Sequence, residues 1–545
     1  MEHKARFIGP VRAAVMVWSF LWALPAAGIF VDGKGHYALR GESRQSPAFR
    51  GGSAFQAIDQ FFRLETEFRT GDKSSFITEF TMFDEPRSAY LGDSSEPSEC
   101  SDEVTTAQGS KYPAGTGNRS DCVSRNQNSI EPGYRSYTPK IRKAYARYAS
   151  DTCLFTVGRR GRDWGLGMFL DSGEGTFDTA ASIYDGVTCD INVQKSQTFG
   201  FSVGYDKISE AGMPIDLVGK ADESFGPKNQ GDDLDQIFFT MEYDTTKGEP
   251  SAYSQKVGIY FANIMGADPL KTDIKLADLY VGFFMPNFTI QNEILFRLGK
   301  SADPNFTRLG GQASIAEDIV RNDVQSIALA GRVDWFMSRS GSLKGPKEHP
   351  AGDLTSHALF FEYAYAPGDK DGYLEQFQAG DDITRLRTDN KASAVAMHRN
   401  FKPALILFNG RMEDDGERID GIFDPGRVMN ATVMSVGYEY KSREYGKFNL
   451  KLVTAQLNEG ITQARKDTYA ADLAADAEGD LVAPIGYAGK DLGMELDLTY
   501  EAQYDHGFYL GGALGMAVPG SAWDVVPNKD PKTQFLIQAH ASFHF

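Results

Sequence analysis

Strict alternation of apolar and charged residues is the feature of this sequence that most constrains its fold. In the stretch FFRLETEFR, residues 61–69, every second residue is charged, namely Arg63, Glu65, Glu67 and Arg69. Successive side chains of a β-strand point to opposite faces, so a strand here has one apolar face and one fully charged face. The charged face either lies in bulk water, as in a soluble sheet, or lines the water-filled interior of a tube.

The same alternation recurs along the whole chain. It is found in IFFTMEYD (237–244), FTIQNEILFRL (288–298), MSVGYEYK (434–441), GMELDLTYE (493–501) and QFLIQAHASFHF (534–545). A period of two is typical of strands with two unlike faces, and its repetition over so many segments indicates a single β architecture.

Nineteen segments of the sequence are strand candidates, whereas known single-chain bacterial barrels have even strand numbers. Short and long links alternate strictly if KPALILFN (402–409) lies inside one long loop, 367–427. Eighteen strands then remain. The link 338–352 falls on the short-turn side, although it is long for a turn. The short turns are 70–75, 149–152, 194–197, 245–251, 285–287, 441–446 and 504–507.

We therefore predict an all-β fold, an 18-stranded antiparallel transmembrane β-barrel with short periplasmic turns and long extracellular loops. Hydrocarbon offers no hydrogen-bond partners, so a sheet can cross a membrane only if closure removes its edges. The charged faces then line a lumen wide enough to hold water. The alternative is a large soluble β-sandwich array or propeller, which does not need one-sided loop lengths.

Residues 1–28 have the pattern of a cleaved export signal. Lys4, Arg6 and Arg12 precede an apolar run of about 15 residues, which is short for a membrane-spanning helix of about 20. A retained anchor is the alternative. We expect residues 29–545 to form one barrel in the bacterial cell outer membrane. The acidic excess, a net charge of -18 for the whole chain, disfavours nucleic acid as a partner.

Four cysteines suit an oxidising compartment outside the cytoplasm. Cys100 and Cys122 flank a segment rich in Ser, Gly and Asp, so a disulfide that closes this loop is one expectation. Cys153 and Cys189 form the second candidate pair, and each of them is equally well explained as a small apolar residue facing lipid.

The second cysteine pair also predicts a strand register. If Cys153 faces Cys189, the hairpin axis lies at residue 171, and Phe155 pairs with Val187 on the same outward face. Both thiols would then sit near the short-turn rim, close enough for a cross-strand disulfide.

The inward faces of the predicted strands supply candidate pore-lining residues of both signs. The basic candidates are Arg63, Arg69, Lys143, Arg147, Arg297 and Arg332. The acidic candidates are Glu293, Glu362, Glu495 and Asp497. A polyanion prefers a path of one positive sign, whereas this lumen is expected to be mixed.

A cluster of three arginines gives a sharper candidate. Arg159, Arg160 and Arg162 follow a predicted strand and precede a Gly-rich link. On a loop folded into the pore, their guanidinium groups would form a constriction that selects anions. Alternatively they pin the loop to the wall, and the partners expected for that role are Asp163, Asp171 and Glu174.

Catalytic and metal sites are not expected. His540, Ser542 and His544 share one face of the last strand, where neighbours two apart are about 7 Å from each other, so hydrogen bonding between them is not favoured. No Cys or His cluster has zinc spacing. The acidic runs 231–235 and 412–417 are interpreted as solvated charge rather than Ca²⁺ sites. The chain is therefore expected to be neither an enzyme nor a binder of metal or cofactor.

Three stretches resemble the alginate-export-like family of outer-membrane barrels. They are FTVGRRGRDWGLGMFLDSGEGTFDTAASIYDGV (155–187), FEYAYAPGDKDG (361–372), and LGMELDL (492–498) followed by AVPGSAW (517–523) and a strand ending at Phe545. The resemblance implies an eighteen-stranded barrel narrowed by inward loops, which passes solutes without an energy source. In the alginate exporters a strongly basic lumen attracts an acidic polysaccharide.

The function predicted from the sequence is an outer-membrane channel for passive passage of polar or anionic solutes, including oligo- or polysaccharide. The alternative is a surface-display or adhesion barrel that acts through its long extracellular loops, especially 84–137 and 367–427. The expected partners are the lipid bilayer, lipopolysaccharide, small polar or anionic solutes, and the outer-membrane assembly machinery, which would recognise the C-terminal strand ending at Phe545.

Overall fold

A computed structural model describes most of the predicted barrel. The predicted signal peptide, residues 1–28, lies outside the described residues, as do Cys100, Cys122 and the acidic run 412–417. The described residues are 30–45, 55–82, 103–105, 111–113, 140–178, 181–192, 198–208, 234–246, 253–266, 272–301, 322–340, 355–368, 391–398, 400–409, 427–442, 444–459, 489–505, 507–523 and 531–545.

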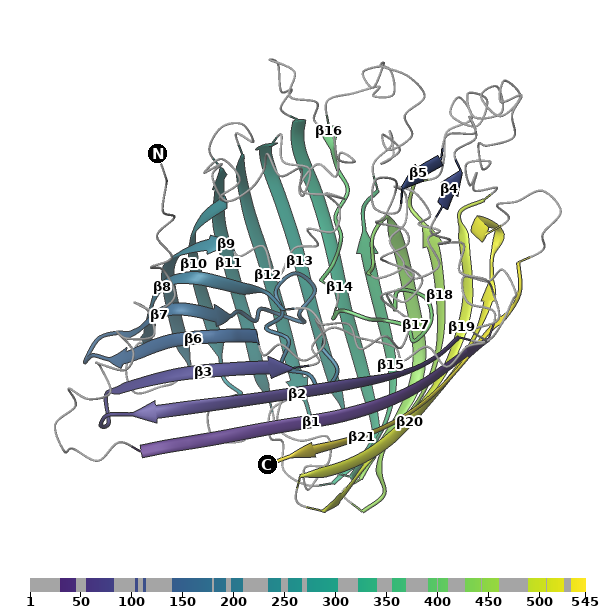
Figure 1. The fold of residues 1–545 in the computed structure, drawn as a ribbon, viewed down its shortest axis with the longest axis horizontal. Helices are drawn as coiled ribbons and strands as arrows, with labels where there is room; N and C mark the ends of the chain where they lie inside the picture. Colours follow the sequence, from purple (N-terminus) through teal and green to yellow (C-terminus); the bar gives the residue numbers. More distant parts are fainter. Residues whose placement is uncertain are drawn as a thin grey trace.

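Eighteen antiparallel strands form the wall of a closed barrel (Figure 1). They follow one another around the wall in chain order, which confirms the predicted fold class. Their bounds are β1 Phe30–Gln45, β2 Phe55–Arg69, β3 Ser74–Met82, β6 Lys140–Ala149, β7 Leu154–Gly161, β8 Ile183–Asn192, β9 Phe199–Ile208, β10 Leu234–Asp244, β11 Ser254–Gly266, β12 Asp273–Met285, β13 Phe288–Ser301, β14 Asn322–Ser340, β15 Thr355–Ala366, β17 Ala431–Ser442, β18 Gly446–Leu457, β19 Asp491–Asp505, β20 Phe508–Pro519 and β21 Gln534–His544.

Three further strands are not part of the wall. β4 (Glu103–Thr105) and β5 (Lys111–Pro113) form a separate two-stranded sheet, and the short β16 (Lys391–Ala392) pairs in parallel with β14. Residues 402–409 form no strand, which agrees with the prediction that they lie inside one long loop between two wall strands.

The barrel closes where its first and last strands meet. β1 pairs with β2 on one side and with β21 on the other, so it has no free edge. The seam ends at Gly35 and Phe545, which exchange two backbone hydrogen bonds of 2.7 and 2.9 Å. Every wall strand therefore has hydrogen-bonded neighbours on both sides, which is the condition for a sheet to lie in hydrocarbon.

Short and long links alternate between the two rims of the barrel. Tight hairpins join β12 to β13 and β17 to β18, whereas residues 83–139 and 367–430 link strands at the other rim. The link 341–354 between β14 and β15 is the long one on the short-turn side. Among the described residues, no helix has the length and apolarity needed to span a bilayer.

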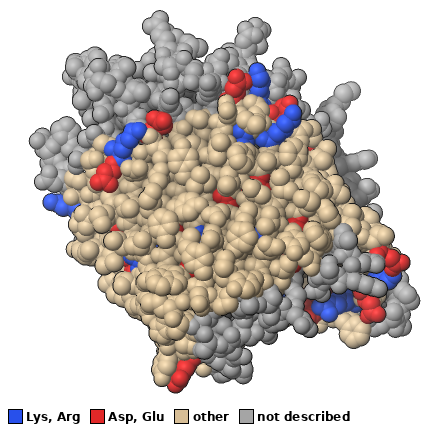
Figure 2. All heavy atoms as spheres, turned by 180° about the vertical axis from the view of Figure 1, so that it is seen from behind, with Lys and Arg blue, Asp and Glu red and all other residues tan. Residues whose placement is uncertain are grey.

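The outer surface of the wall is apolar. Large side chains such as Ile237, Leu298 and Trp335 are more than half exposed and point away from the lumen. Figure 2 shows a broad, mostly uncharged band with a few small charged patches, and larger groups of charged side chains toward its edges. The charged residues of FFRLETEFR face inward, where Arg63 lies 3.8 Å from Glu79. The alternation is thus that of a membrane barrel, with lipid outside and water inside.

The predicted register of the β7–β8 hairpin is wrong by two residues. Phe155 pairs with Cys189, and Val157 pairs with Val187. Cys153, just before β7, is joined to Cys189 by a disulfide with a Cα–Cα distance of 5.6 Å. A shift of two preserves the faces, because side chains alternate with a period of two. The register is set by the long link that enters the lumen, whose backbone the cysteine positions do not reveal.

Two glycines on the lumen face of β9 give a matched test of packing. A methyl group at Gly204 would overlap the Phe238 ring and lie 2.6 Å from the Val187 carbonyl oxygen, whereas Gly200 has nothing within 4 Å. We expect Gly204→Ala to lower the unfolding free energy of the folded barrel by about 1–3 kcal/mol through overpacking. Gly200→Ala should leave it unchanged. Urea unfolding in detergent micelles measures both, and equal effects would contradict this account of the packing.

Candidate pore constriction

The link between β7 and β8 folds into the lumen, and we call residues 162–182 the first inward segment. Its Trp164 packs on β11, where a methyl group at Gly258 would lie 2.8 Å from the indole ring. Leu166 then donates its backbone N–H to the buried carboxylate of Glu293 on β13. Gly165 has φ +58° and no room for a Cβ beside that carboxylate, so a glycine is needed at this bend. The wall thus fixes the tip of the segment.

The base of the first inward segment is held by two of the three predicted arginines. Arg160 and Arg162 both pair with Asp206 on β9, and Arg162 also lies 3.7 Å above the Phe238 ring. Arg159 points to the outside of the barrel, because β7 continues to Gly161 and so gives it the parity of Val157. Its partner is Asp185.

The carboxylates predicted as partners of these arginines have other contacts. Asp163 and Asp171 instead accept backbone N–H groups of Ser172 and Gly173, each at 2.7 Å, and so stabilise turns within the segment itself. Glu174 pairs with Lys143. The short side chains of Asp163 and Asp171 accept hydrogen bonds from backbone amides of their own turns, whereas the longer arginine side chains reach the barrel wall.

The long link after β15 sends a second segment into the lumen, residues 393–409. The backbone N–H groups of Leu405, Ile406 and Leu407 all donate to the Glu495 carboxylate on β19, at 2.8, 2.7 and 2.8 Å. Asp497, the next lumen-facing residue of β19, accepts from Leu405 at 3.3 Å. Three convergent amides around one carboxylate are a strong charge-assisted contact, so β19 anchors this second inward segment.

The two inward segments meet inside the barrel. His398 donates its backbone N–H to the Met168 carbonyl oxygen at 2.7 Å, and the Asn400 side chain donates to Asp171 at 3.0 Å. Around these contacts lies a buried apolar cluster, which includes Met168, Leu170, Met397, Ile406, Leu407 and Phe408. Part of the lumen is therefore filled by a protein core and is closed to water.

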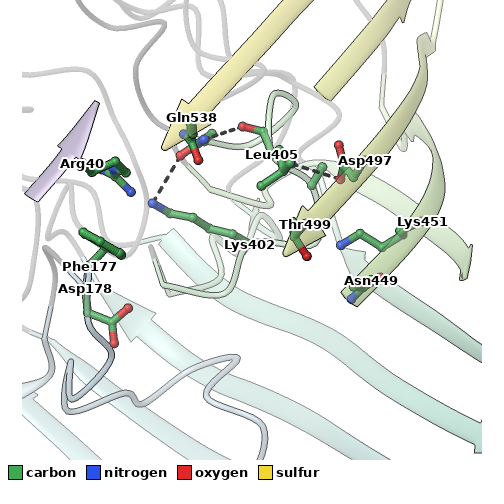
Figure 3. A pocket seen from close by; sticks show the side chains of 12 residues that line it. Arg40, Phe177, Asp178, Lys402, Leu405, Asn449, Lys451, Asp497, Thr499 and Gln538 are labelled. Carbon is green, nitrogen blue, oxygen red and sulfur yellow. Dashed lines mark hydrogen bonds between the residues drawn. The ribbon is translucent and has the colours of Figure 1, made fainter. Parts of the chain in front are cut away.

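A cavity of about 200 Å³ remains beside this core. Phe177 and Asp178 come from the first inward segment, and Lys402 and Leu405 come from the second. The barrel wall supplies the remaining polar groups, which are Arg40, Asn449, Lys451, Asp497, Thr499 and Gln538. In Figure 3 the Lys402 side chain extends toward Arg40. The cavity is thus enclosed by both inward segments and by strands β1, β18, β19 and β21.

Basic side chains outnumber acidic ones in the lining of this cavity, three to two. Arg40 donates to Asp59 at 2.9 and 3.1 Å and stacks 4.9 Å from the Phe177 ring. Lys402 is exposed to the lumen yet closely surrounded by protein atoms. Desolvation first, and the positive charge of Arg40 second, lower the pKa of Lys402 to about 8. Burial, followed by the negative charge of Asp171, raises the pKa of Asp178.

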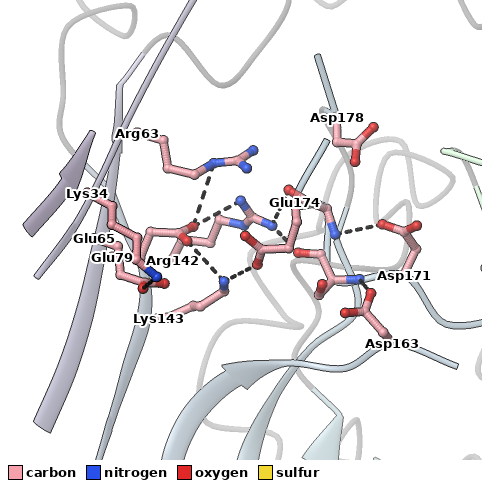
Figure 4. Close-up of polar contacts among 12 residues, drawn as sticks. Lys34, Arg63, Glu65, Glu79, Arg142, Lys143, Asp163, Asp171, Glu174 and Asp178 are labelled. Carbon is pink, nitrogen blue, oxygen red and sulfur yellow. Dashed lines mark hydrogen bonds and ion pairs between the residues drawn. The ribbon is translucent and has the colours of Figure 1, made fainter. Parts of the chain in front are cut away.

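A separate charged cluster lies on β2, β3 and β6 (Figure 4). The β3–β6 register shifts by one residue at a β-bulge, so both Arg142 and Lys143 face the lumen. They reach the two oxygens of Glu79 at 2.9 and 3.0 Å. Arg142 also donates to the carbonyl oxygens of Ser172 and Gly173. The bulge therefore adds a second basic contact to the first inward segment, which simple alternation missed.

Of the other predicted pore-lining residues, Arg332 and Glu362 lie in a cluster of wall ion pairs, whereas Arg297 is held by hydrogen bonds. Arg332 contacts Asp334, Glu362 and Glu439 at 2.7, 2.6 and 3.4 Å. Arg297 donates to Ser326 and to the Ala394 carbonyl oxygen, at 3.0 and 2.5 Å.

The remaining two lie away from the cavity. Arg69 pairs with Glu67 at 2.7 Å at the short-turn rim, and Arg147 donates to the Tyr145 hydroxyl at 3.2 Å.

The last strand places its polar residues separately, as their spacing indicated. His540 lies 3.5 Å from Glu501, while His544 stacks on His36 with ring centroids 4.5 Å apart. Ser542 is buried. Sequence alternation did not identify Arg40, Phe177 or Lys402 as cavity residues. The sequence offered one indication, namely that Arg40 occupies an inward-facing position in the alternation of β1.

Replacing Glu495 tests the anchor of the second inward segment. Glu495→Gln has one acceptor oxygen in place of a carboxylate, so we expect the segment to lose about 3 kcal/mol of contact with the wall. Single-channel recordings should then show larger and noisier currents. Glu501→Gln, on the same strand and face but paired with His540, is the matched control. If the amplitude and noise of the Glu495→Gln current equal those of the unaltered chain, this contact does not hold the segment.

Comparison with known proteins finds similar solved structures but no sequence relatives. No family model and no curated protein matches the sequence. Similar solved structures include OccK5 (OpdH) of Pseudomonas aeruginosa, with 9% identity, 94% of this chain and 98% of that chain covered, and a TM-score of 0.42. OprD from Pseudomonas aeruginosa has 8% identity, 94% coverage of each chain and a TM-score of 0.43.

A third similar structure is Pseudomonas aeruginosa OpdK with vanillate, which has 11% identity, covers 94% of this chain and 98% of that chain, and has a TM-score of 0.41. These are Occ and OprD proteins, and not alginate exporters. Such low identities and TM-scores carry no functional assignment. The closed wall and the apolar exterior are what make the chain a transmembrane β-barrel of the bacterial outer-membrane type.

Proposed function

We propose that this barrel is a passive outer-membrane channel for small polar and anionic solutes. The observation that carries the proposal is the cavity between the two inward segments, whose lining contains three cations, Arg40, Lys402 and Lys451, and two carboxylates, Asp178 and Asp497. A narrow site inside a low-dielectric wall concentrates ions of the opposite sign. The amide groups of Asn449 and Gln538 add hydrogen-bonding capacity for a polar solute.

Small solutes fit this arrangement better than the acidic polysaccharide that the sequence resemblance implied. A long polyanion needs a continuous path of one positive sign. Here the wall cations have carboxylate neighbours, as Arg332 has in Asp334 and Glu362. The cavity of about 200 Å³ holds a small molecule, so we propose a selective passage rather than an export tunnel.

The membrane partners in this proposal follow from the apolar outer surface of the barrel wall. The apolar belt contacts the bilayer, and lipopolysaccharide is the outer-leaflet lipid that it would meet. Phe543 and Phe545 stack with ring centroids 5.7 Å apart and are exposed at the end of the chain. This exposed aromatic pair is what the assembly machinery would recognise. No catalytic role forms part of the proposal.

Planar-bilayer recording of the purified, folded chain tests the channel directly. We expect a stable open current and a reversal potential that indicates preference for chloride over potassium. Silence of the folded protein would overturn the channel proposal and favour surface display through the long loops, many of whose residues lie outside the described ranges.

The pH dependence of selectivity tests the role of Lys402. With a pKa of about 8, its charge falls from about 0.9 at pH 7 to about 0.1 at pH 9. Anion preference should therefore decrease over this range, because raising the pH removes a cation from the cavity. Lys402→Gln should lower the preference at pH 7 and abolish the change, while Lys402→Arg should keep a high preference at both pH values. Reversal potentials in a salt gradient measure this.

The control for this prediction is Lys73→Gln. Lys73 lies in the turn after β2 and pairs with Asp151 at 3.2 Å, and both side chains are largely exposed at the short-turn rim. A pH effect of the same size in Lys402→Gln and in the unaltered chain would show that the titrating group is elsewhere.

A further inference from the structure

A row of charged residues crosses the outer face of the barrel on neighbouring strands. Arg159, Asp185, Lys207 and Asp235 are directly opposite one another in the register of β7, β8, β9 and β10. They have the parity of exposed Val157, Val187, Tyr205 and Ile237, so they point away from the lumen. Arg159 and Asp185 form a two-pronged ion pair at 2.7 and 2.9 Å. Their side chains are 41% and 43% exposed.

The row rises across the wall. Lys207 and Asp235, eight and nine residues from the short-turn ends of β9 and β10, lie roughly 20 and 23 Å above the short-turn rim, whereas Arg159 lies well below the level of lipid headgroups. Arg159 follows only five residues after Leu154, the first residue of β7. At about 3.3 Å per residue and a strand tilt of about 40°, this is roughly 13 Å above the short-turn rim, half of an apolar belt of about 25 Å. Lys300, on the outward face of β13, follows twelve residues after Phe288 and lies roughly 30 Å above that rim.

The apolar belt is short on β7, whereas on β9 and β10 four outward apolar or aromatic residues separate the charge from the short-turn end. On β7, only Phe155 and Val157 precede the charged pair. On the strands β20, β21, β1 and β2, by contrast, no described outward position carries a charged residue along the whole strand. Charges at the middle of a lipid-facing wall are costly, and here they are confined to one side of the barrel. Acyl chains are therefore an unfavourable surrounding for the lower end of the row, Arg159 and Asp185.

The signs of the charges indicate what covers them. The row alternates, with two cations and two anions, so a lipid headgroup of one sign would be repelled by half of it. A surface with the same alternation is complementary. We propose that the outer face of β7–β10 is the contact surface for a second copy of this chain. The inference needs a membrane-embedded barrel, but it does not depend on whether the barrel conducts.

A two-fold axis along the membrane normal makes the row complementary to itself. Such an axis keeps the height of each residue and reverses the order of the strands, so the two rows cross at their centre. With the axis between β8 and β9, Asp185 of one copy lies next to Lys207 of the other, and the reverse contact follows by symmetry. The central ion pairs are then withdrawn from lipid.

Charge reversal in mixed copies tests this proposal. Native mass spectrometry from detergent and from lipid nanodiscs should show dimers of the unaltered chain. Asp185→Lys or Lys207→Asp alone should raise the dimer dissociation constant about tenfold or more, because like charges meet across the axis. Mixing the two variants should restore association as mixed dimers. A pair that acts only within one chain is broken in each variant and cannot be repaired by mixing.

The matched control is Lys300→Asp, because Lys300 is also outward-facing and paired across strands, with Asp323 at 3.2 Å, but lies at the upper end of the wall. It should leave the dimer unchanged. Circular dichroism and an unchanged single-channel current confirm that each variant folds. If the protein forms dimers but conducts no current, the proposed function fails and the proposed contact surface does not. Two results would overturn the proposal. One is that the unaltered chain is monomeric in both media, and the other is that Lys207→Asp loses co-purified lipid while its oligomeric state stays the same.

Discussion

The absence of hydrogen-bond partners in hydrocarbon is the constraint on which this structure depends. It requires every backbone amide of the wall to find a partner in a neighbouring strand, and the contact of β1 with β21 completes that condition. Closure in turn divides each strand into a lipid face and a water face. The alternation of FFRLETEFR, the inward ion pair of Arg63 with Glu79 and the exposed apolar side chains outside all follow from this division.

The same constraint operates inside the lumen, in a different form. Chain segments that enter a barrel carry backbone amides that cannot join the wall sheet, so other acceptors must be found for them. Wall carboxylates serve this purpose. Glu293 receives the tip of the first inward segment, and Glu495 receives three consecutive amides of the second. Glu293 and Glu495, which strand alternation assigned to the pore lining, thus hold the constriction in place.

The sequence predicted the wall well, because a period of two fixes faces locally. FTIQNEILFRL was assigned to the correct faces from its own residues, and the strand number followed from the links. Errors arose where distant contacts decide. Arg159 turned outward because β7 is longer than expected, and Arg142 turned inward because of a bulge against β3. Lys402 lies in a segment correctly excluded from the wall, yet its neighbours Arg40 and Asp178 are hundreds of residues away in sequence, beyond any local pattern.

The contact between the two inward segments has a consequence for how the molecule is made. Asn400 and Asp171 are 229 positions apart, and the elements that bring them together lie on separate parts of the wall. Contacts of such long range form late, because the intervening chain must first be ordered. The seam between β1 and β21 has a still longer range, because Glu42 and Gln538 are 496 positions apart, so the wall is expected to close after the inward segments meet. During its biogenesis the chain would therefore pass through an open sheet that already carries its joined inward segments before it becomes a tube.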